Sequence, residues 1–196
     1  GTIFPVLAAS VAAYGFARFS FRGRDFLFML IVALMTLPQQ MIAVPLFRIM
    51  NKLGAVDSYT GLMVVHSAWG IPWILYFMRN YFSTLPIEIE EAAKVDGASD
   101  WRIFLQIVMP MALPAVASSS VLQFMWVWSD FFLALILIYS PTKLLATQRV
   151  PLLRGVYHVD WGVLAAGSII VMTVPIIVFA LMQRYYIRGM VGWVSK

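Results

Sequence analysis

Residues 85–110, LPIEIEEAAKVDGASDWRIFLQIVMP, form a charged stretch inside a chain that is otherwise strongly apolar. Five of the nine acidic residues of the chain lie in it: Glu88, Glu90, Glu91, Asp96 and Asp100. Because unpaired charges are costly in an apolar environment, this stretch is expected to face water where the apolar part of the protein ends.

The composition around this stretch is that of a membrane protein. Of the 196 residues, 62% are hydrophobic and 12% are charged, against roughly 45–50% and about 25% in soluble domains. The chain has no cysteine, so it cannot form a disulfide or a thiolate metal site. The net charge of +5 comes from basic residues scattered at the ends of apolar runs, which argues for membrane anchoring and against nucleic-acid binding.

Five apolar runs are long enough to cross a bilayer, which takes about 20 residues per helix. The predicted fold is therefore an all-α membrane protein, a polytopic helical bundle. Buried helices of a soluble protein would need polar faces at helical spacing, and several of these runs lack them. The expected spans are at about 1–17, 26–48, 59–80, 111–139 and 162–184.

The basic residues predict the orientation of the bundle, since cytoplasmic loops keep an excess of Lys and Arg. One set of loops holds nine of them: Arg18, Arg22, Arg24, Arg79, Lys94, Arg102, Arg184, Arg188 and Lys196. The other set holds five: Arg48, Lys52, Lys143, Arg149 and Arg154. The stretch 83–110 and the C-terminus are therefore expected inside and Gly1 outside. The chain has no initiator Met, and we expect an upstream span to be missing.

The charged stretch is predicted to fold as two short helices. Ser83 or Thr84 is expected to cap the first, and Gly97 to end it in the left-handed conformation. The second is expected to begin at Ser99 or Asp100. A simple connector needs only a handful of residues, so we favour a helix that docks on a partner protein over a solvated loop.

The stretch resembles the EAA motif of permease subunits of binding-protein-dependent ABC importers. That motif is Glu-Ala-Ala, three residues, Gly, nine residues, Ile, one residue and Leu-Pro, and here Glu91 begins it, followed by Gly97 and Ile107. Met109 replaces the motif leucine with a similar volume. The flanks are similar to those of carbohydrate importers of the maltose type. The resemblance extends to FMWVWSDFFLALILI at 124–138 and covers nearly the whole chain.

This resemblance implies the type I importer permease fold, with six spans in the full-length protein and a bacterial or archaeal plasma membrane location. It implies four partners: cytoplasmic ABC ATPase subunits, a second permease subunit, an extracytoplasmic substrate-binding protein and the lipid bilayer. ATP and Mg²⁺ would be used by the ATPase, since this chain has no G-x-x-x-x-G-K stretch. The implied ATPase-coupling residues are Glu90, Glu91, Ala92, Ala93, Asp96, Gly97, Ile107 and Pro110.

Polar residues within the spans are candidates for a translocation path, because such groups are costly in lipid. The residues expected to face protein or a watery cavity are Gln39, Gln40, His66, Ser67, Gln123, Asp130 and Thr173. Trp126 joins the candidates because aromatic rings stack on sugars, although they also fill helix interfaces. Asp130 is either a functional carboxylate or a stabilising partner of a neighbouring helix. His66 has no second ligand at metal spacing, so no metal site is expected.

The loop at about 140–161 on the outside either meets the binding protein or forms a short interfacial helix, and the two are compatible. A rival function is an ion-coupled secondary carrier that is energised through Asp130. A membrane anchor without a transport path would not need the polar residues within the spans. Prolines 38, 45, 72 and 175 predict kinked or broken helices.

Overall fold

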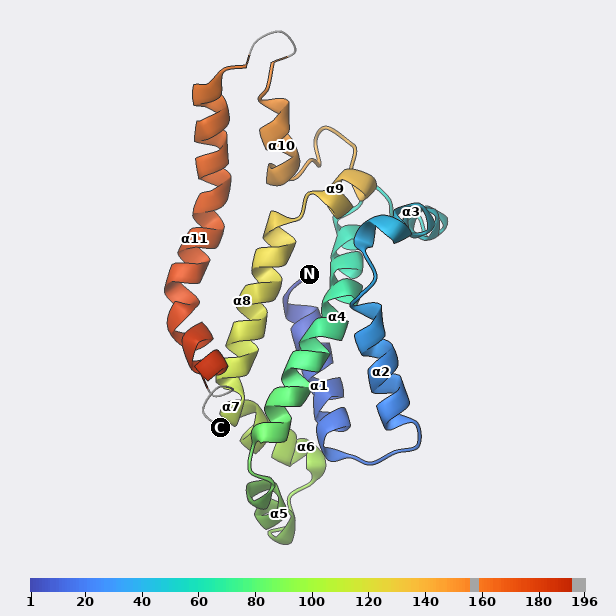
Figure 1. Cartoon of the computed structure of the whole chain (residues 1–196), viewed down its shortest axis with the longest axis vertical. Coiled ribbons are helices and arrows are strands. Elements are labelled where there is room, and N and C mark those ends of the chain that lie inside the picture. Colours follow the sequence, from blue (N-terminus) through green and yellow to red (C-terminus); the bar gives the residue numbers. More distant parts are fainter. Residues whose placement is uncertain (156–158, 192–196) are drawn as a thin grey trace.

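The computed structural model of this chain describes residues 1–155 and 159–191, with side chains up to residue 183 in the last helix. Every regular element in these ranges is helical (Figure 1). The elements are α1 (Ile3–Arg18), α2 (Arg24–Leu34), a 3-10 turn η1 (Gln39–Ile42), α3 (Ala43–Lys52), α4 (Tyr59–Thr84), α5 (Ile87–Val95), α6 (Asp100–Ile103), a π-helical segment η2 (Phe104–Val108), α7 (Met109–Met111), α8 (Leu113–Ser129), α9 (Phe132–Leu137), α10 (Ala146–Leu152) and α11 (Trp161–Val191).

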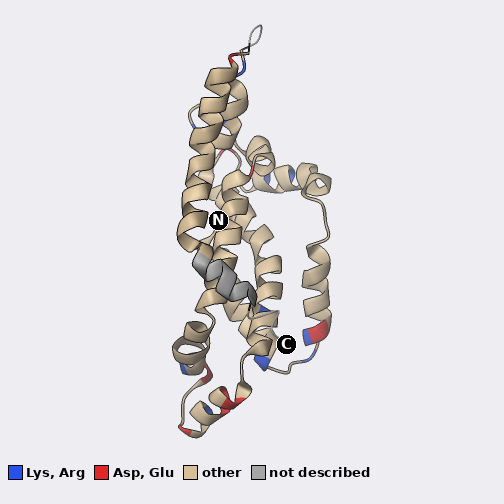
Figure 2. Cartoon of the chain, turned by 60° about the vertical axis from the view of Figure 1, so that its left-hand side comes forward, with Lys and Arg blue, Asp and Glu red and all other residues tan. Residues whose placement is uncertain are grey.

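Two helices are long and apolar enough to cross a membrane unaided, α4 and the part of α11 up to Gln183. Two further spans are possible if each of two bent helix pairs counts as one. The run predicted at 1–17 forms the single helix α1, whose 16 residues extend about 24 Å. Figure 2 shows the charged residues towards the two ends of the long helices.

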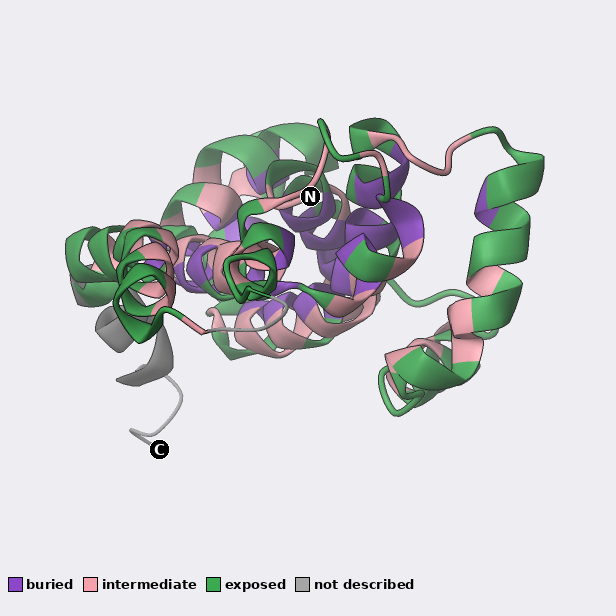
Figure 3. Cartoon of the chain, turned by 90° about the horizontal axis from the view of Figure 1, so that it is seen from above, coloured by how far each residue is buried: buried purple, intermediate pink, exposed green. Residues whose placement is uncertain are grey.

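The central core lies between α1, α4 and the segment that leads into α8. Ala9 and Ala13 of α1 are fully buried, and such small residues let two helices approach closely. Figure 3 shows the buried residues concentrated on these inner helices and the exposed ones on the outer helices. The core residues are Val6, Ala9, Ala13, Tyr14, Ile74, Leu75, Met78, Phe82, Ile103, Phe104, Val108, Ala112 and Ala115.

The run predicted as one span at 26–48 does not form one continuous helix. Helix α2 ends at Leu34, and the chain then bends by 92° into η1 and α3. Pro38 lies at the break in an extended conformation, as expected for a residue that cannot donate a helical hydrogen bond. The run at 111–139 is likewise divided, because α8 ends at Ser129 and α9 is a separate short helix.

Asp57 joins two loops at the end of the bundle opposite α5. Its carboxylate accepts hydrogen bonds from Tyr139 N at 3.1 Å, from Ser140 N at 3.0 Å and from the Ser140 hydroxyl. Lys143 Nζ lies 3.1 Å from the same carboxylate. The hydrogen bonds from Ser140 are the main reason that the pKa of Asp57 lies well below its usual range.

Helix α11 packs mainly along α8 and is the most exposed of the long helices. Trp128 Nε1 of α8 donates to Val171 O at 3.0 Å. Only 6% of the most apolar 18-residue stretch of α11 is buried, however. Thr173, expected to face protein or a watery cavity, is exposed on this chain, and its hydroxyl donates to Ile169 O of its own helix at 2.7 Å. A hydroxyl that is satisfied in this way needs no neighbouring helix.

The segment predicted as an outer loop, at about 140–161, contains the short helix α10. Leu152 at its end is exposed, and so is Leu153, which follows it. Residues 156–158 of the predicted loop lie outside the described residues.

Candidate functional site

Helix α5 begins and ends by backbone geometry alone. Ser83 and Thr84 do not cap it as predicted, because their hydroxyls donate to Arg79 O and Tyr81 O and complete the end of α4. Pro86 occupies the N-cap position of α5, where its fixed φ suits entry into a helix.

Gly97 ends α5 as predicted, in a left-handed conformation with a φ of 82°. Gly97 N donates to Lys94 O at 3.0 Å, and Ala98 N donates to Ala93 O at 2.9 Å. This pair of bonds is the Schellman motif, which satisfies the last carbonyl groups of a helix. Ser99 caps α6 as predicted, by accepting from Arg102 N at 3.4 Å.

One side of α5 is exposed and partly apolar. We call Ile87, Ile89, Glu91, Ala92 and Val95 its outward face. Val95 is 88% exposed, Ile87 47% and Ile89 42%, and Glu91 and Ala92 are exposed beside them. Apolar side chains left in water on a helix that also carries charge are typical of a surface that meets another protein.

The opposite side of α5 is fixed to the bundle. Glu90 is buried, and its carboxylate pairs with Arg18 of α1 at 2.7 Å, Nε to Oε1. Ala93 packs against the central core. The sequence placed Glu90 and Ala93 among the residues that face a partner, but their side chains point into this chain. Of the same predicted set, Asp96 and Gly97 are exposed.

The second half of the stretch returns the chain to the bundle through the π-helical segment η2. Phe104 and Val108 of η2 are buried in the central core, and Ile107 packs against it. Pro110 is exposed in α7, and the axis bends by 74° between α7 and α8. Ile107 therefore helps to hold the loop on the bundle, whereas Pro110 is exposed next to the bend.

The predicted path residues largely converge on one small polar pocket between α4, α8 and η1. It encloses about 10 Å³, enough for at most one water molecule. Gln40 does not line it and is exposed. Trp126 is 54% exposed at its edge. The pocket is lined by Gln39, His66, Trp69, Gly70, Trp73, Gln123, Trp126, Val127 and Asp130.

Hydrogen bonds hold Gln123 at the centre of this pocket. Its Oε1 accepts from Trp73 Nε1 at 2.9 Å, and its Nε2 donates to His66 O at 3.3 Å. The buried Nε2 of His66 makes no hydrogen bond within the described residues, and Asp130 Oδ2 lies 3.6 Å from it. This leaves one polar atom of the pocket free to bind a hydroxyl group or a water molecule.

The carboxylate of Asp130 binds the start of α9. Its Oδ1 accepts from Leu133 N at 3.2 Å and its Oδ2 from Ala134 N at 3.0 Å. These two donors belong to the first turn of α9, where a negative charge is favourable. The stabilising alternative for Asp130 is therefore the one that its contacts support. No cluster of three His, Cys, Asp or Glu side chains suited to a metal ion occurs within the described ranges.

Sequence reasoning missed two residues that bind Glu90: Arg18, which forms the ion pair, and Tyr14, whose hydroxyl donates to Glu90 Oε2 at 2.9 Å. Arg18 was interpreted as a membrane anchor, although it follows Tyr14 by four positions on one helix face, a spacing that brings their side chains together. Sequence reasoning also missed Trp73, whose indole nitrogen fixes Gln123.

The sequence matches known transport proteins along almost its whole length. The profile of the family described as binding-protein-dependent transport system inner membrane component matches residues 2–191. A probable ABC transporter permease protein of Pyrococcus horikoshii is 60% identical, over 98% of this chain and 70% of its own length. The alpha-glucoside transport system permease protein AglG of Rhizobium meliloti is 39% identical, over 97% of this chain and 52% of its own.

Two more distant proteins are also similar to this chain, one in sequence and one in fold. The trehalose/maltose transport system permease protein MalG of Thermococcus litoralis is 32% identical, over 100% of this chain and 70% of its own length. A chain of the MetNI methionine ABC transporter, solved in inward facing conformations, has the same fold with a TM-score of 0.68 and 15% identity; the match covers 96% of this chain and 88% of that one.

Fold and sequence together define a transmembrane permease subunit of an ABC transporter. The chain belongs to the family of binding-protein-dependent transport system inner membrane components, which confirms the resemblance found in residues 85–110. It spans between 52% and 70% of the lengths of the three relatives given above.

Proposed function

We propose that this chain is the transmembrane subunit of an ATP-driven carbohydrate importer and receives its energy through α5. The observation that carries the proposal is the division of α5 into a buried side and an outward face with exposed Ile87, Ile89 and Val95. A short helix that offers apolar and charged groups to water fits a cleft on a partner protein. The partner is a cytoplasmic ABC ATPase subunit, which binds ATP and Mg²⁺.

The other partners follow from the same assignment. A second permease subunit completes the translocation path, and an extracytoplasmic binding protein delivers the solute at the end that carries the Asp57 loops and α10. The membrane is the plasma membrane of a bacterium or archaeon, with α5 and the C-terminus in the cytoplasm, as the excess of basic residues on that side indicates.

Carbohydrate is the solute class because relatives are named for alpha-glucoside and for trehalose/maltose transport. The polar pocket suits a neutral polyhydroxy solute, since it combines the His66 nitrogen and Gln39 with the rings of Trp69, Trp73 and Trp126. Its volume of about 10 Å³ cannot hold a sugar ring, so a sugar would enter it only when α4 and α8 separate. Movement of packed helices as rigid bodies would open it.

The alternative, an ion-coupled carrier energised through Asp130, has less support. A carboxylate that moves protons or ions must change its partners during the cycle, whereas Asp130 accepts two backbone hydrogen bonds from α9. Breaking these bonds would leave two buried N–H groups unpaired, at about 1–3 kcal/mol each.

The test is uptake by the full-length permease, reconstituted in liposomes with its ATPase and binding protein. Glu91→Lys is expected to insert normally but to lose the co-purifying ATPase and ATP-dependent uptake. The control is Asp25→Lys, the same charge change at an exposed position on α2, which should retain both. Unchanged uptake and solute-stimulated ATP hydrolysis in Glu91→Lys would refute docking through α5. Uptake that collapses with the proton gradient in the presence of ATP would favour the carrier.

A further inference from the structure

The buried side of α5 holds a complete polar cluster that is not part of the outward face. Tyr14 Oη donates to Glu90 Oε2 at 2.9 Å, and Arg18 Nε donates to Glu90 Oε1 at 2.7 Å. Arg18 Nη2 also donates to Leu85 O at 3.0 Å. We call Tyr14, Arg18, Leu85 and Glu90 the anchor cluster. The side chains of Arg18 and Glu90 are only 10% and 6% exposed.

The anchor cluster connects three separate elements. Tyr14 and Arg18 lie on one face of the last turns of α1, Leu85 follows directly after α4, and Glu90 belongs to α5. The Tyr14 ring also contacts Phe82 of α4 and Phe104 of η2, with centroids 6.1 and 5.0 Å apart. Both the beginning and the end of the loop are thus attached to α1 around a single tyrosine.

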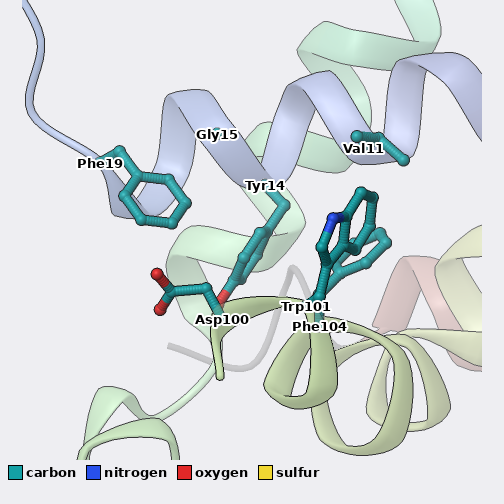
Figure 4. A pocket seen from close by; sticks show the side chains of 7 residues that line it. All are labelled: Val11, Tyr14, Gly15, Phe19, Asp100, Trp101 and Phe104. Carbon is teal, nitrogen blue, oxygen red and sulfur yellow. The ribbon is translucent and has the colours of Figure 1, made fainter. Parts of the chain in front are cut away.

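Side-chain packing around the cluster leaves a gap between α1 and α6. A pocket of about 300 Å³ lies there, lined by Val11, Tyr14, Gly15, Phe19, Asp100, Trp101 and Phe104. Figure 4 shows Tyr14 extending from α1 across this space towards the loop, with Trp101 and Phe104 on its far side. The two sides do not meet across this pocket, so here α1 is connected to the loop by the anchor cluster and the Tyr14–Phe104 ring contact, in addition to the apolar contacts of the central core.

The placement of Glu90 argues for transmission of movement. A carboxylate that served the ATPase would be exposed, as Glu88 and Glu91 are. A buried ion pair contributes little net stability compared with apolar residues of the same shape, but it fixes the relative position of the groups that it joins. Glu90 binds two side chains of α1 and so fixes the orientation of α5 relative to that helix.

We propose that the anchor cluster is the joint through which movement of α5 reaches α1, and that Tyr14, Arg18 and Glu90 are positioning residues for transport. This inference rests on the proposed docking of α5 on an ATPase. The outward face receives the movement of the ATPase, and the anchor cluster passes it to α1 as well as to α4, so that the two helices tilt together.

The experiment measures solute molecules transported per ATP hydrolysed by the full-length complex in liposomes, together with the amount of co-purified ATPase. Glu90→Gln removes the charge, and Tyr14→Phe removes one hydroxyl. Tyr81→Phe is the matched control, since its hydroxyl lies 3.5 Å from Met111 O at the same end of the bundle. We expect roughly tenfold less transport per ATP for Glu90→Gln, the scale of one charge-assisted hydrogen bond, and a smaller loss for Tyr14→Phe. Both should keep the ATPase bound.

The double variant Tyr14→Phe with Glu90→Gln should lose less than the product of the two single losses, because both changes remove the same contact. Three outcomes would overturn the proposal: transport per ATP unchanged in both single variants, an equal loss in Tyr81→Phe, or release of the ATPase by Glu90→Gln. Failure of the proposed function is distinguishable, because the wild-type protein would then not co-purify with any ATPase.

Discussion

Replacing Gly97 by valine is expected to strain the end of α5 without creating a clash. The φ of Gly97 is 82°, and a Cβ atom built there would meet nothing within 4 Å. The cost is therefore the backbone cost of a left-handed L-residue, about 1–2 kcal/mol. An energy of this size shifts a local two-state equilibrium by roughly 5- to 30-fold, away from the conformation that holds α5 in its observed orientation.

Transport per ATP in the reconstituted complex is the measurement, with the melting temperature of the permease in detergent as the measure of global stability. Gly97→Val should lower transport per ATP about fivefold or more. Gly97→Asn should lower it little, because asparagine tolerates the left-handed region. The melting temperature should change little in either variant, since α5 is peripheral to the central core.

Gly23 provides a matched control in the α1–α2 loop. It has a φ of 84°, and a Cβ atom added there would also meet nothing within 4 Å. Gly23→Val therefore carries the same strain away from α5 and should leave transport per ATP unchanged. The reasoning is refuted if Gly97→Val behaves as wild type, or if Gly23→Val causes an equal loss.

Of three further predictions, two concern the opposite end of the bundle and one concerns helix α1. Asp57→Asn should lower the melting temperature at pH 5–7. The pKa of Asp57 is lower in the folded state than in the unfolded state, so the ionised carboxylate stabilises the fold. This stabilisation is fully present above the unfolded-state pKa of about 3.9 and is lost as the pH falls from there towards the folded-state pKa. Melting curves of the wild type and the variant at pH 7 and below pH 4 check this, and a difference in melting temperature that widens on acidification would contradict it.

Gly61→Ala should lower the free energy of unfolding by about 1–3 kcal/mol or more, because its Cβ would lie 2.0 Å from the backbone oxygen of Ala55. Gly15→Ala, with open space around its Cβ, should be neutral or up to about 1 kcal/mol stabilising in the same denaturation assay.

Sequence patterns predicted the parts of the fold that depend on local chemistry. The apolar runs around α4 and α11, the helix ended by Gly97 and the cap at Ser99 each follow from residues close together in the chain. The break at Pro38 was predicted as a kink, but its size was not, because the bend depends on how α3 packs against the rest of the bundle.

The orientation of α5 could not be predicted in the same way. Glu90 and Glu91 are adjacent and chemically alike, and which of them faces inward is decided by Arg18, which is 72 positions from Glu90 in the sequence. The pocket residues were identified as polar groups within apolar runs, but Gln39 and Gln40 differ only in the direction that the turn η1 gives them. Asp130 was recognised as unusual, whereas its binding to the start of α9 depended on the end of α8 at Ser129.

The contrast between α4 and α11 has a consequence for biogenesis. The most apolar 18-residue stretch of α11 has a mean hydropathy of 2.5 and is 6% buried. The corresponding stretch of α4 has a mean hydropathy of 1.3 and is 50% buried. A helix as apolar as α11 partitions from the translocon into lipid on its own. Helix α4 carries His66, Ser67 and two glycines, and it becomes stable in lipid only after α1 and α8 cover those groups. During synthesis α4 is therefore expected to stay beside the translocon until α8 has been made. Helix α11, in contrast, is expected to enter the lipid without waiting for a neighbouring helix.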